Sequence, residues 1–203
     1  MIALASIVGV LLAATRTAAL WPLPQELSTG TSALKLSPAF TVDLSGVANA
    51  PSDLYDAVSR VKTQLNDDKL AILTVDRGAS NANAVEKAKS LSQLRVSVPK
   101  GTKIQSISHE AVQPLGTRQE GYTLVVPADG SPATLTANSS LGLLRGLTTF
   151  TQLWYDLDGT TYTIQAPVHI TDAPAYVSVV CSRWLVIMTI LIIALPWTDA
   201  RYG

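Results

Sequence analysis

The two histidines of this chain, His109 and His169, are the first residues to consider for metal binding or catalysis. His109-Glu110 starts like the zinc-protease helix motif, in which a second histidine follows the first by four residues. Position 113 is glutamine, so the second ligand of that motif is missing. His169 alternates with Val168 and Ile170, which is typical of an ordinary strand residue. We therefore predict that the chain holds neither a metal ion nor a cofactor.

The acidic side chains do not form a catalytic pattern either. Asp156 and Asp158 follow a predicted helix and are expected in a loop. Gly-x-Ser-x-Gly, the P-loop and the dinucleotide-binding fingerprint are absent from the sequence. We predict no catalytic residue in this chain. Four other carboxylates lie on or beside another predicted helix, where a solvated surface is their usual place: Asp53, Asp56, Asp67 and Asp68.

One motif for covalent modification is present. Asn138-Ser139-Ser140 is an N-glycosylation sequon, which makes Asn138 a candidate glycan acceptor if the protein is secreted. The alternative is that Asn138 lies in a turn and bonds the neighbouring backbone.

Composition and the first segment of the chain indicate a secreted protein. The formal net charge is 0 and the isoelectric point is about 6.7, so no nucleic-acid-binding surface is expected. Residues 1–19 contain an unbroken apolar run and end in Thr17-Ala18-Ala19, which is typical of a signal peptide. A buried or anchoring helix is the alternative. The mature chain would then start near Leu20, outside the cell.

The last 27 residues, 177–203, are unusually apolar. Trp184–Leu195 is interrupted only by Thr189, and extension back to Val177 gives enough length to span a membrane but includes Arg183. As a membrane span the segment is marginal. Cys181 is the only cysteine, so an intramolecular disulfide is impossible.

The middle of the chain predicts strands and one helix before residue 100. Alternation predicts strands at Phe40–Leu44 and Leu94–Val98. A helix is expected from Ser52, with Ser52 as its cap and one buried stripe made of Leu54, Val58, Val61 and Leu65. Residues 70–75 suit either a strand or a continuation of that helix, and residues 77–83 are expected to be a loop.

The second half predicts a hairpin, a helix and two further short strands. The hairpin joins residues 121–126 to 133–137 through a turn rich in Pro, Asp and Gly. A helix follows over residues 140–154, capped by Ser139 or Ser140. Gly142 and Gly146 lie on one face of it, which indicates close approach to another backbone, because each glycine costs about 1 kcal/mol in a helix. Strands at 162–165 and 168–170 complete an α+β pattern.

Four segments of this sequence resemble the non-catalytic N-terminal domain of secreted β-N-acetylhexosaminidases of glycoside hydrolase family 20, and the secreted fungal branch in particular. They are the Trp-Pro-Leu-Pro start at 21–24, Glu-Gly-Tyr-Thr-Leu at 120–124, the helix at 141–153 and residues 166–176. The signature positions of the helix are Gly142, Arg145, Gly146, Phe150 and Leu153. The resemblance implies a zincin-like sandwich over residues 20–176, in which a small, mostly antiparallel sheet carries helices on one face.

The resemblance also implies a function that this chain supports only in part. In such enzymes the domain buttresses a (β/α)8 barrel, which removes terminal N-acetylhexosamine from chitin oligomers and glycans. The substrate's own acetamido group is the nucleophile there, and adjacent Asp and Glu residues of the barrel assist it. No Asp-Glu pair occurs in this sequence. The chain alone is therefore expected to be inactive, with the missing barrel as its partner.

The likeness stops after Tyr176, where the family continues with Pro-Tyr-Arg-Gly and this chain reads Val177-Ser178. A consensus intron start translates as Val-Ser, so residues 177–203 are interpreted as a translated intron. Two alternatives stay open at this point. The chain is either a secreted, non-catalytic docking module or a small membrane protein anchored by residues 177–195.

Overall fold

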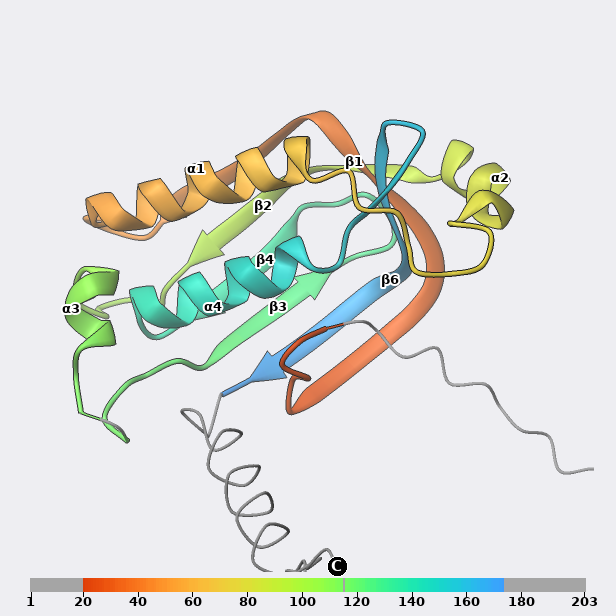
Figure 1. The fold of residues 1–203 in the computed structure, drawn as a ribbon. Coiled ribbons are helices and arrows are strands. Elements are labelled where there is room, and N and C mark those ends of the chain that lie inside the picture. The colour runs from red at the N-terminus through yellow and green to blue at the C-terminus, as the bar shows by residue number, and fades with distance from the viewer. Residues whose placement is uncertain (1–19, 115, 174–203) are drawn as a thin grey trace, which may run out of the picture.

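The computed structural model describes residues 20–114 and 116–173. The expected signal peptide at 1–19, the apolar segment at 177–203 and Cys181 lie outside these residues. The described part forms six strands, four α-helices and one 3-10 turn, arranged as an α+β structure as predicted (Figure 1). Its elements are β1 (Glu26–Gly46), α1 (Ser52–Asp67), a 3-10 turn (Ala79–Asn81), α2 (Ala82–Glu86), β2 (Lys89–Ser97), α3 (Ile107–Ala111), β3 (Tyr122–Val126), β4 (Ala133–Ala137), α4 (Ser140–Thr151), β5 (Tyr155–Leu157) and β6 (Thr160–Asp172).

The sheet has the order β1-β2-β4-β3-β6-β5 and is mixed. The pairs β1–β2 and β2–β4 are parallel, whereas β1–β6, β3–β4, β3–β6 and β5–β6 are antiparallel. The β3–β4 hairpin was predicted from its turn. The parallel pairs were not, because they join strands that are separated by helices and long connections.

Strand β1 pairs with β2 and also with β6, which lies toward the other end of the strand order. Its first half pairs with β6, from Glu26 opposite Thr171 to Lys35 opposite Tyr162. Its second half pairs with β2, from Leu34 opposite Lys89 to Gly46 opposite Ser97. The strand curves around one end of the sheet to do this (Figure 1). The predicted strand at residues 40–44 is thus the last quarter of a much longer one.

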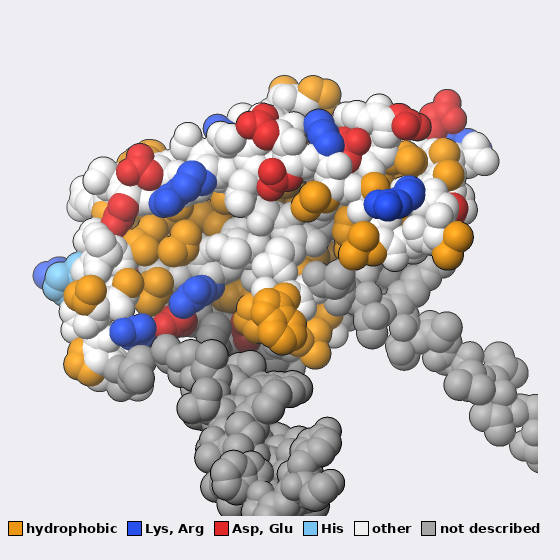
Figure 2. All heavy atoms as spheres, in the orientation of Figure 1, with side chains coloured by type: hydrophobic (Ala, Val, Ile, Leu, Met, Phe, Trp, Pro, Cys, Tyr) orange, Lys and Arg blue, Asp and Glu red, His pale blue; other side chains and the backbone are white. Residues whose placement is uncertain are grey.

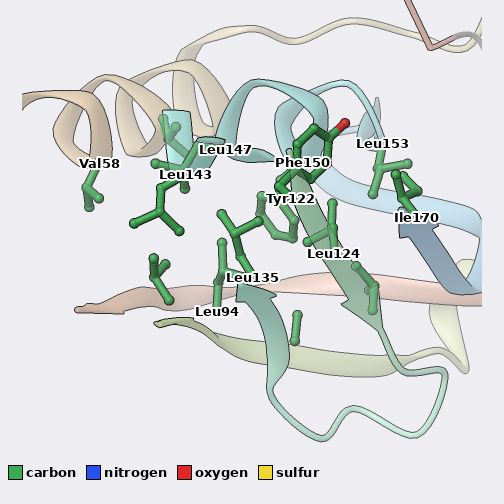
Figure 3. Packing of buried hydrophobic residues seen from close by; sticks show 14 of the residues in the cluster. Val58, Leu94, Tyr122, Leu124, Leu135, Leu143, Leu147, Phe150, Leu153 and Ile170 are labelled. Atoms are coloured by element: carbon green, nitrogen blue, oxygen red, sulfur yellow. The ribbon is translucent and has the colours of Figure 1, made fainter. Parts of the chain in front are cut away.

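Helices α1 and α4 pack side by side on one face of the sheet (Figure 1). The stripe predicted on the first helix is buried as expected. Figure 3 shows Leu143, Leu147 and Phe150 of α4 turned toward Leu94 and Leu135 of the sheet. All five side chains are fully buried, so the core lies between the two helices and this face.

Two local predictions around α1 were wrong. The cap of α1 is Pro51, which makes no side-chain capping bond, and Ser52 is already helical. Proline preceding a helix has an extended backbone that starts the helix without a hydroxyl cap. Residues 70–75 form neither strand nor helix, and Leu73 and Val75 are exposed. Their apolar character therefore does not reflect burial within this domain.

Three further segments differ from the prediction. Residues 79–86, expected as a loop in part, form the 3-10 turn and α2. Asp156, expected in a loop, belongs to β5. The two short strands expected on either side of Ala166-Pro167 are one strand, β6, which continues through the proline. Pro167 lacks an N–H but falls where the β1–β6 ladder is already irregular, between Thr29 and Ser32.

Candidate functional site

Helix α4 is the centre of the described domain, and two polar groups hold its first turn. The Ser139 hydroxyl accepts a hydrogen bond from the Gly142 nitrogen at 2.9 Å, as the sequence predicted for a cap. Glu110 of α3 accepts a second bond from the Leu141 nitrogen at 2.8 Å, and the same carboxylate oxygen lies 2.9 Å from the Ser140 hydroxyl. A carboxylate at this end also complements the positive end of the helix dipole. No local sequence pattern indicated this role of Glu110, which lies 31 positions before Leu141.

The two glycines of α4 allow it to lie close against the sheet. A Cβ atom added to Gly142 would be 2.5 Å from the carbonyl oxygen of Gly121, so here α4 meets backbone, as predicted. A Cβ atom on Gly146 would instead meet the side chains of Leu135 and Tyr122. The prediction of a backbone contact is therefore confirmed at Gly142, and at Gly146 it is corrected to a side-chain contact.

Two of the other signature residues, Phe150 and Leu153, are buried, whereas Arg145 forms an ion pair at the surface. Its Nε donates to Glu120 Oε2 at 2.8 Å. Glu120 is 8% exposed and the Arg145 side chain is 49% exposed. The pair therefore satisfies a buried carboxylate and leaves the outer side of the guanidinium facing solvent. Glu120 belongs to the segment 120–124 that resembles the family. Its ion pair with Arg145 became evident only from the structure.

Trp21 is held firmly although its side chain is exposed. Its backbone nitrogen donates to Gln152 Oε1 at 2.8 Å, and its carbonyl accepts from Gln152 Nε2 at 3.0 Å. The Gln152 carboxamide thus pairs with the backbone of Trp21 beside the end of α4. The Trp21 side chain is 80% exposed. The backbone of Trp21 is thus fixed while its indole faces solvent, and exposed tryptophan is enriched at interaction surfaces.

Other exposed apolar side chains lie on the same side of the domain. Tyr55 projects from α1, and Leu70 lines a hollow of about 270 Å³ with Thr148 and Gln152, between the ends of α1 and α4. Figure 2, which views the molecule as in Figure 1, shows hydrophobic side chains between and below these helices. We call this surface, defined by Trp21, Leu70 and the outer sides of α1 and α4, the helix face.

The opposite face of the sheet is polar. Strand partners share a face, and the pairs Arg95–Thr134, Ser97–Thr136 and Thr123–Thr171 place hydroxyl and charged groups on the side away from the helices. His169 lies in the same surface, opposite Val125. Within the described residues, this face of the sheet is therefore more polar than the helix face.

The candidate chemical groups of the sequence stay apart in the structure. His109 is in α3 and His169 is in β6, and no three His, Cys, Asp or Glu side chains gather as metal ligands within the described residues. Asp53 accepts hydrogen bonds from the Ser108 nitrogen and hydroxyl, both at 3.0 Å, and so ties α1 to α3. This role is structural, and the sequence did not suggest it.

Tyr122 lies under α4 in the segment 120–124 that was singled out in the sequence. Its hydroxyl is 2.6 Å from the Thr149 hydroxyl, so it links β3 to the last turn of α4. Burial raises the pKa of Tyr122 to about 12, and the phenol stays neutral at physiological pH. Asn138 is exposed in the turn between β4 and α4. In residues 20–114 and 116–173, no helix is both long and apolar enough to span a membrane.

A family model described as beta-acetyl hexosaminidase like matches residues 20–153. The chain belongs to this family. The resemblance seen at residues 21–24, 120–124 and 141–153 is thereby confirmed, whereas residues 166–176 lie beyond the matched range. No match was found among curated protein sequences.

Solved structures of hexosaminidase-like enzymes share this fold. The chitobiase of Flavobacterium johnsoniae aligns with 77% of this chain at 24% sequence identity and a TM-score of 0.51. An exo-β-N-acetylglucosaminidase of Vibrio harveyi aligns with 77% of the chain at 15% identity and a TM-score of 0.43. The chain spans 21% of the first protein and 19% of the second. It therefore matches only one domain of a much longer enzyme.

Proposed function

We propose that this chain is the N-terminal, non-catalytic domain of a secreted β-N-acetylhexosaminidase and that its helix face docks on a (β/α)8 barrel. The observation that carries this proposal is the exposed apolar surface around the immobilised Trp21, on a domain that spans about a fifth of its relatives. Burying one tryptophan removes about 150–250 Å² from water, which is worth about 4–6 kcal/mol at 25 cal/mol per Å² before the cost of association.

The hollow between α1 and α4 supports the same docking mode. It is lined by Leu70, Thr148, Thr151 and Gln152, and the Gln152 carboxamide is hydrogen-bonded to the backbone of Trp21. A side chain of the barrel would fill it with apolar contact at one end and hydrogen bonds at the other. The polar sheet face, which carries Arg95 and Thr134, would stay in water.

Hydrolysis of terminal N-acetylhexosamine from chitin oligomers and glycans would belong to the barrel. The described domain would raise the stability of that barrel and fix its position, without touching the substrate. This assignment follows from the family and from the absence of an adjacent Asp-Glu pair in the sequence.

The experiment is to express residues 20–203 together with the isolated barrel of a fungal family 20 enzyme. We expect a one-to-one complex and a higher thermal unfolding midpoint of the barrel. A (β/α)8 barrel of an unrelated enzyme is the specificity control. A surface that binds through non-specific hydrophobic contact would capture both barrels. Capture of both barrels, or of neither, would overturn the proposal.

A second candidate is a separate docking module that acts without its own barrel, and the same exposed helix face favours it. Sequencing of transcripts across codon 177 distinguishes the two. Messages that join Tyr176 to Pro-Tyr-Arg-Gly and a barrel identify an enzyme domain. Messages that all encode residues 177–203 followed by a stop codon identify a separate module.

A further inference from the structure

Asn138 is presented in a way that suits covalent modification. It lies in the two-residue connection between β4, which ends at Ala137, and α4, which starts at Ser140. The residue is exposed, and its carboxamide makes no hydrogen bond to the part of the chain that the structure describes. A turn asparagine that bonded the neighbouring backbone, the alternative considered from the sequence, would have such a bond. The folded structure therefore leaves room for a group attached to this side chain.

The surface next to Asn138 is hollowed rather than flat. Asn138 lines a cavity of about 490 Å³ together with Lys103, His109, Gln113 and Arg118. This volume falls within the range of about 300–1,000 Å³ that is usual for small-ligand sites. All lining residues carry polar side chains, and apolar parts of these side chains contribute to the surface, which suits a sugar with both polar groups and an apolar ring face.

Hydrogen bonds position Arg118 and Gln113 in the hollow, and hydrogen-bond donors remain available there for a ligand. Arg118 Nε donates to the Gln113 carbonyl at 2.7 Å, which fixes the guanidinium but leaves its two terminal nitrogens available. Gln113 Nε2 donates to the His109 carbonyl at 3.3 Å. Lys103 is exposed at the rim. These groups match the hydroxyl and acetamido oxygens of an N-acetylhexosamine.

We propose that Asn138 carries an N-linked glycan and that the first N-acetylglucosamine of this glycan lies in the hollow beside Lys103 and Arg118. The donor is a lipid-linked oligosaccharide diphosphate of the secretory pathway. A bond forms between the Asn138 amide nitrogen and C1 of the sugar, and the bond between C1 and the diphosphate oxygen breaks. The lipid diphosphate leaves with the electron pair, and the amide nitrogen loses one proton.

The sequon hydroxyl indicates when this transfer takes place. Ser140 is fully buried, and its hydroxyl donates to the Gln105 carbonyl at 2.7 Å and contacts Glu110. A transferase that reads the sequon needs this hydroxyl in the open. Transfer therefore precedes the packing of α3 against the start of α4. The folded domain then closes the hollow around the sugar.

The first test measures occupancy. Residues 20–203 are expressed in yeast behind a heterologous secretion leader, so that the targeting activity of residues 1–19 has no effect on the result. We expect one glycan, removed by peptide N-glycosidase with conversion of Asn138 to aspartate in the peptide mass spectrum. Asn138→Gln should abolish the modification. Unmodified Asn138 in the secreted or the cell-retained protein would overturn the proposal.

The second test asks whether the hollow holds the sugar. Endoglycosidase H leaves the first N-acetylglucosamine, whereas peptide N-glycosidase removes it. We expect the thermal midpoint to fall by about 2 °C or more only in the second treatment. Lys103→Ala should reduce this difference.

The matched control places a glycan where no hollow lies. In the Asn138→Gln background, Thr134→Asn creates an acceptor ahead of Leu135 and Thr136, on the exposed polar face of β4. Loss of its first sugar should not change the midpoint. Equal shifts at the two positions would show that the sugar acts without the hollow and would overturn this part of the proposal.

Discussion

Glu110 accepts a hydrogen bond from the backbone nitrogen of Leu141 at 2.8 Å, so the short helix α3 caps the longer helix α4. Glu110→Ala removes this acceptor and the contact with the Ser140 hydroxyl. We expect the free energy of unfolding to fall by about 1–2 kcal/mol. Glu110→Gln keeps one acceptor and should lose less. Urea denaturation measures both, with the exposed Glu86→Ala as control. Equal losses for the Ala and Gln variants would contradict the capping role.

The glycines of α4 give a prediction with an unusual sign. Glycine to alanine in a helix normally stabilises by about 1 kcal/mol. Gly142→Ala should instead destabilise by about 1–3 kcal/mol, because the new methyl group meets the Gly121 carbonyl, which cannot move easily. Gly146→Ala should cost less, since it meets the ends of flexible side chains. Thr148→Ala on the exposed side of α4 is the control, and thermal denaturation of all three is the measurement. Stabilisation by Gly142→Ala would show that α4 does not approach the sheet so closely.

Acid should loosen the connection between α1 and α2 before the rest of the domain. Hydrogen bonds from Ser80, followed by those from Gly78 and Thr74, hold the pKa of Asp76 well below its ordinary value of 3.8. A carboxylate whose pKa is lower in the folded state stabilises fully above about pH 5 and loses this contribution as the pH falls through its ordinary value toward the folded one.

The measurement for Asp76 is amide exchange of residues 74–80 between pH 6 and pH 2.5, corrected for intrinsic exchange. Protection should decline below about pH 4 in the natural protein. In Asp76→Asn, protection should be weak at every pH and nearly independent of it. Asp158→Asn, in the exposed turn between β5 and β6, should behave as the natural protein does. Unchanged protection down to pH 2.5 would refute the role of Asp76.

Binding to the barrel should depend on Trp21 more than on any other exposed residue. Trp21→Ala should weaken the proposed complex by about 30-fold or more, which corresponds to at least 2 kcal/mol. Gln152→Ala leaves the indole in place but releases its backbone, so a smaller loss is expected. Thr134→Ala on the polar face should have no effect. Titration calorimetry with the isolated barrel measures the affinities of the three variants. A loss of affinity in Thr134→Ala would show that the barrel contacts the polar face of the sheet instead of the helix face.

Purified residues 20–203 should not hydrolyse a chromogenic N-acetylglucosaminide. The expected rate is that of the substrate in buffer alone. Addition of the isolated barrel in the same assay gives the positive control and shows whether the domain raises the half-life of the barrel at elevated temperature. Turnover by the chain alone would mean that a catalytic group outside the Asp-Glu scheme is present.

The sequence predicted those parts of the fold that depend on local patterns. The stripe on α1, the β3–β4 hairpin and the Ser139 cap each come from residues that are close in the chain, where periodicity and turn chemistry decide. The length of β1 was missed because its two halves pair with different strands, and no single alternation runs through it. The continuity of β6 was missed because a proline such as Pro167 normally interrupts a strand.

The interaction features were harder to predict because they join distant residues. Trp21 and Gln152 are 131 positions apart, and Glu110 and Leu141 are 31 apart. The Trp-Pro-Leu-Pro segment was noticed as a motif, but only the structure shows that the indole is exposed while its backbone is fixed. Asn138 was found directly from its sequon, whereas the hollow beside it required the fold.

The wrapping of β1 around the sheet sets an order of events during synthesis. Strand β1 leaves the ribosome first, but the strand that completes its first half, β6, ends at Asp172, 126 residues after Gly46. At about 5–20 residues per second, β1 waits roughly 6–25 s for that partner. Asn138 emerges 34 residues before Asp172, about 2–7 s ahead at the same rate. The sheet beneath α4 is therefore still incomplete when Asn138 emerges, because β1 and β3 both lack β6, and a few seconds remain for the transfer before the domain can complete its fold.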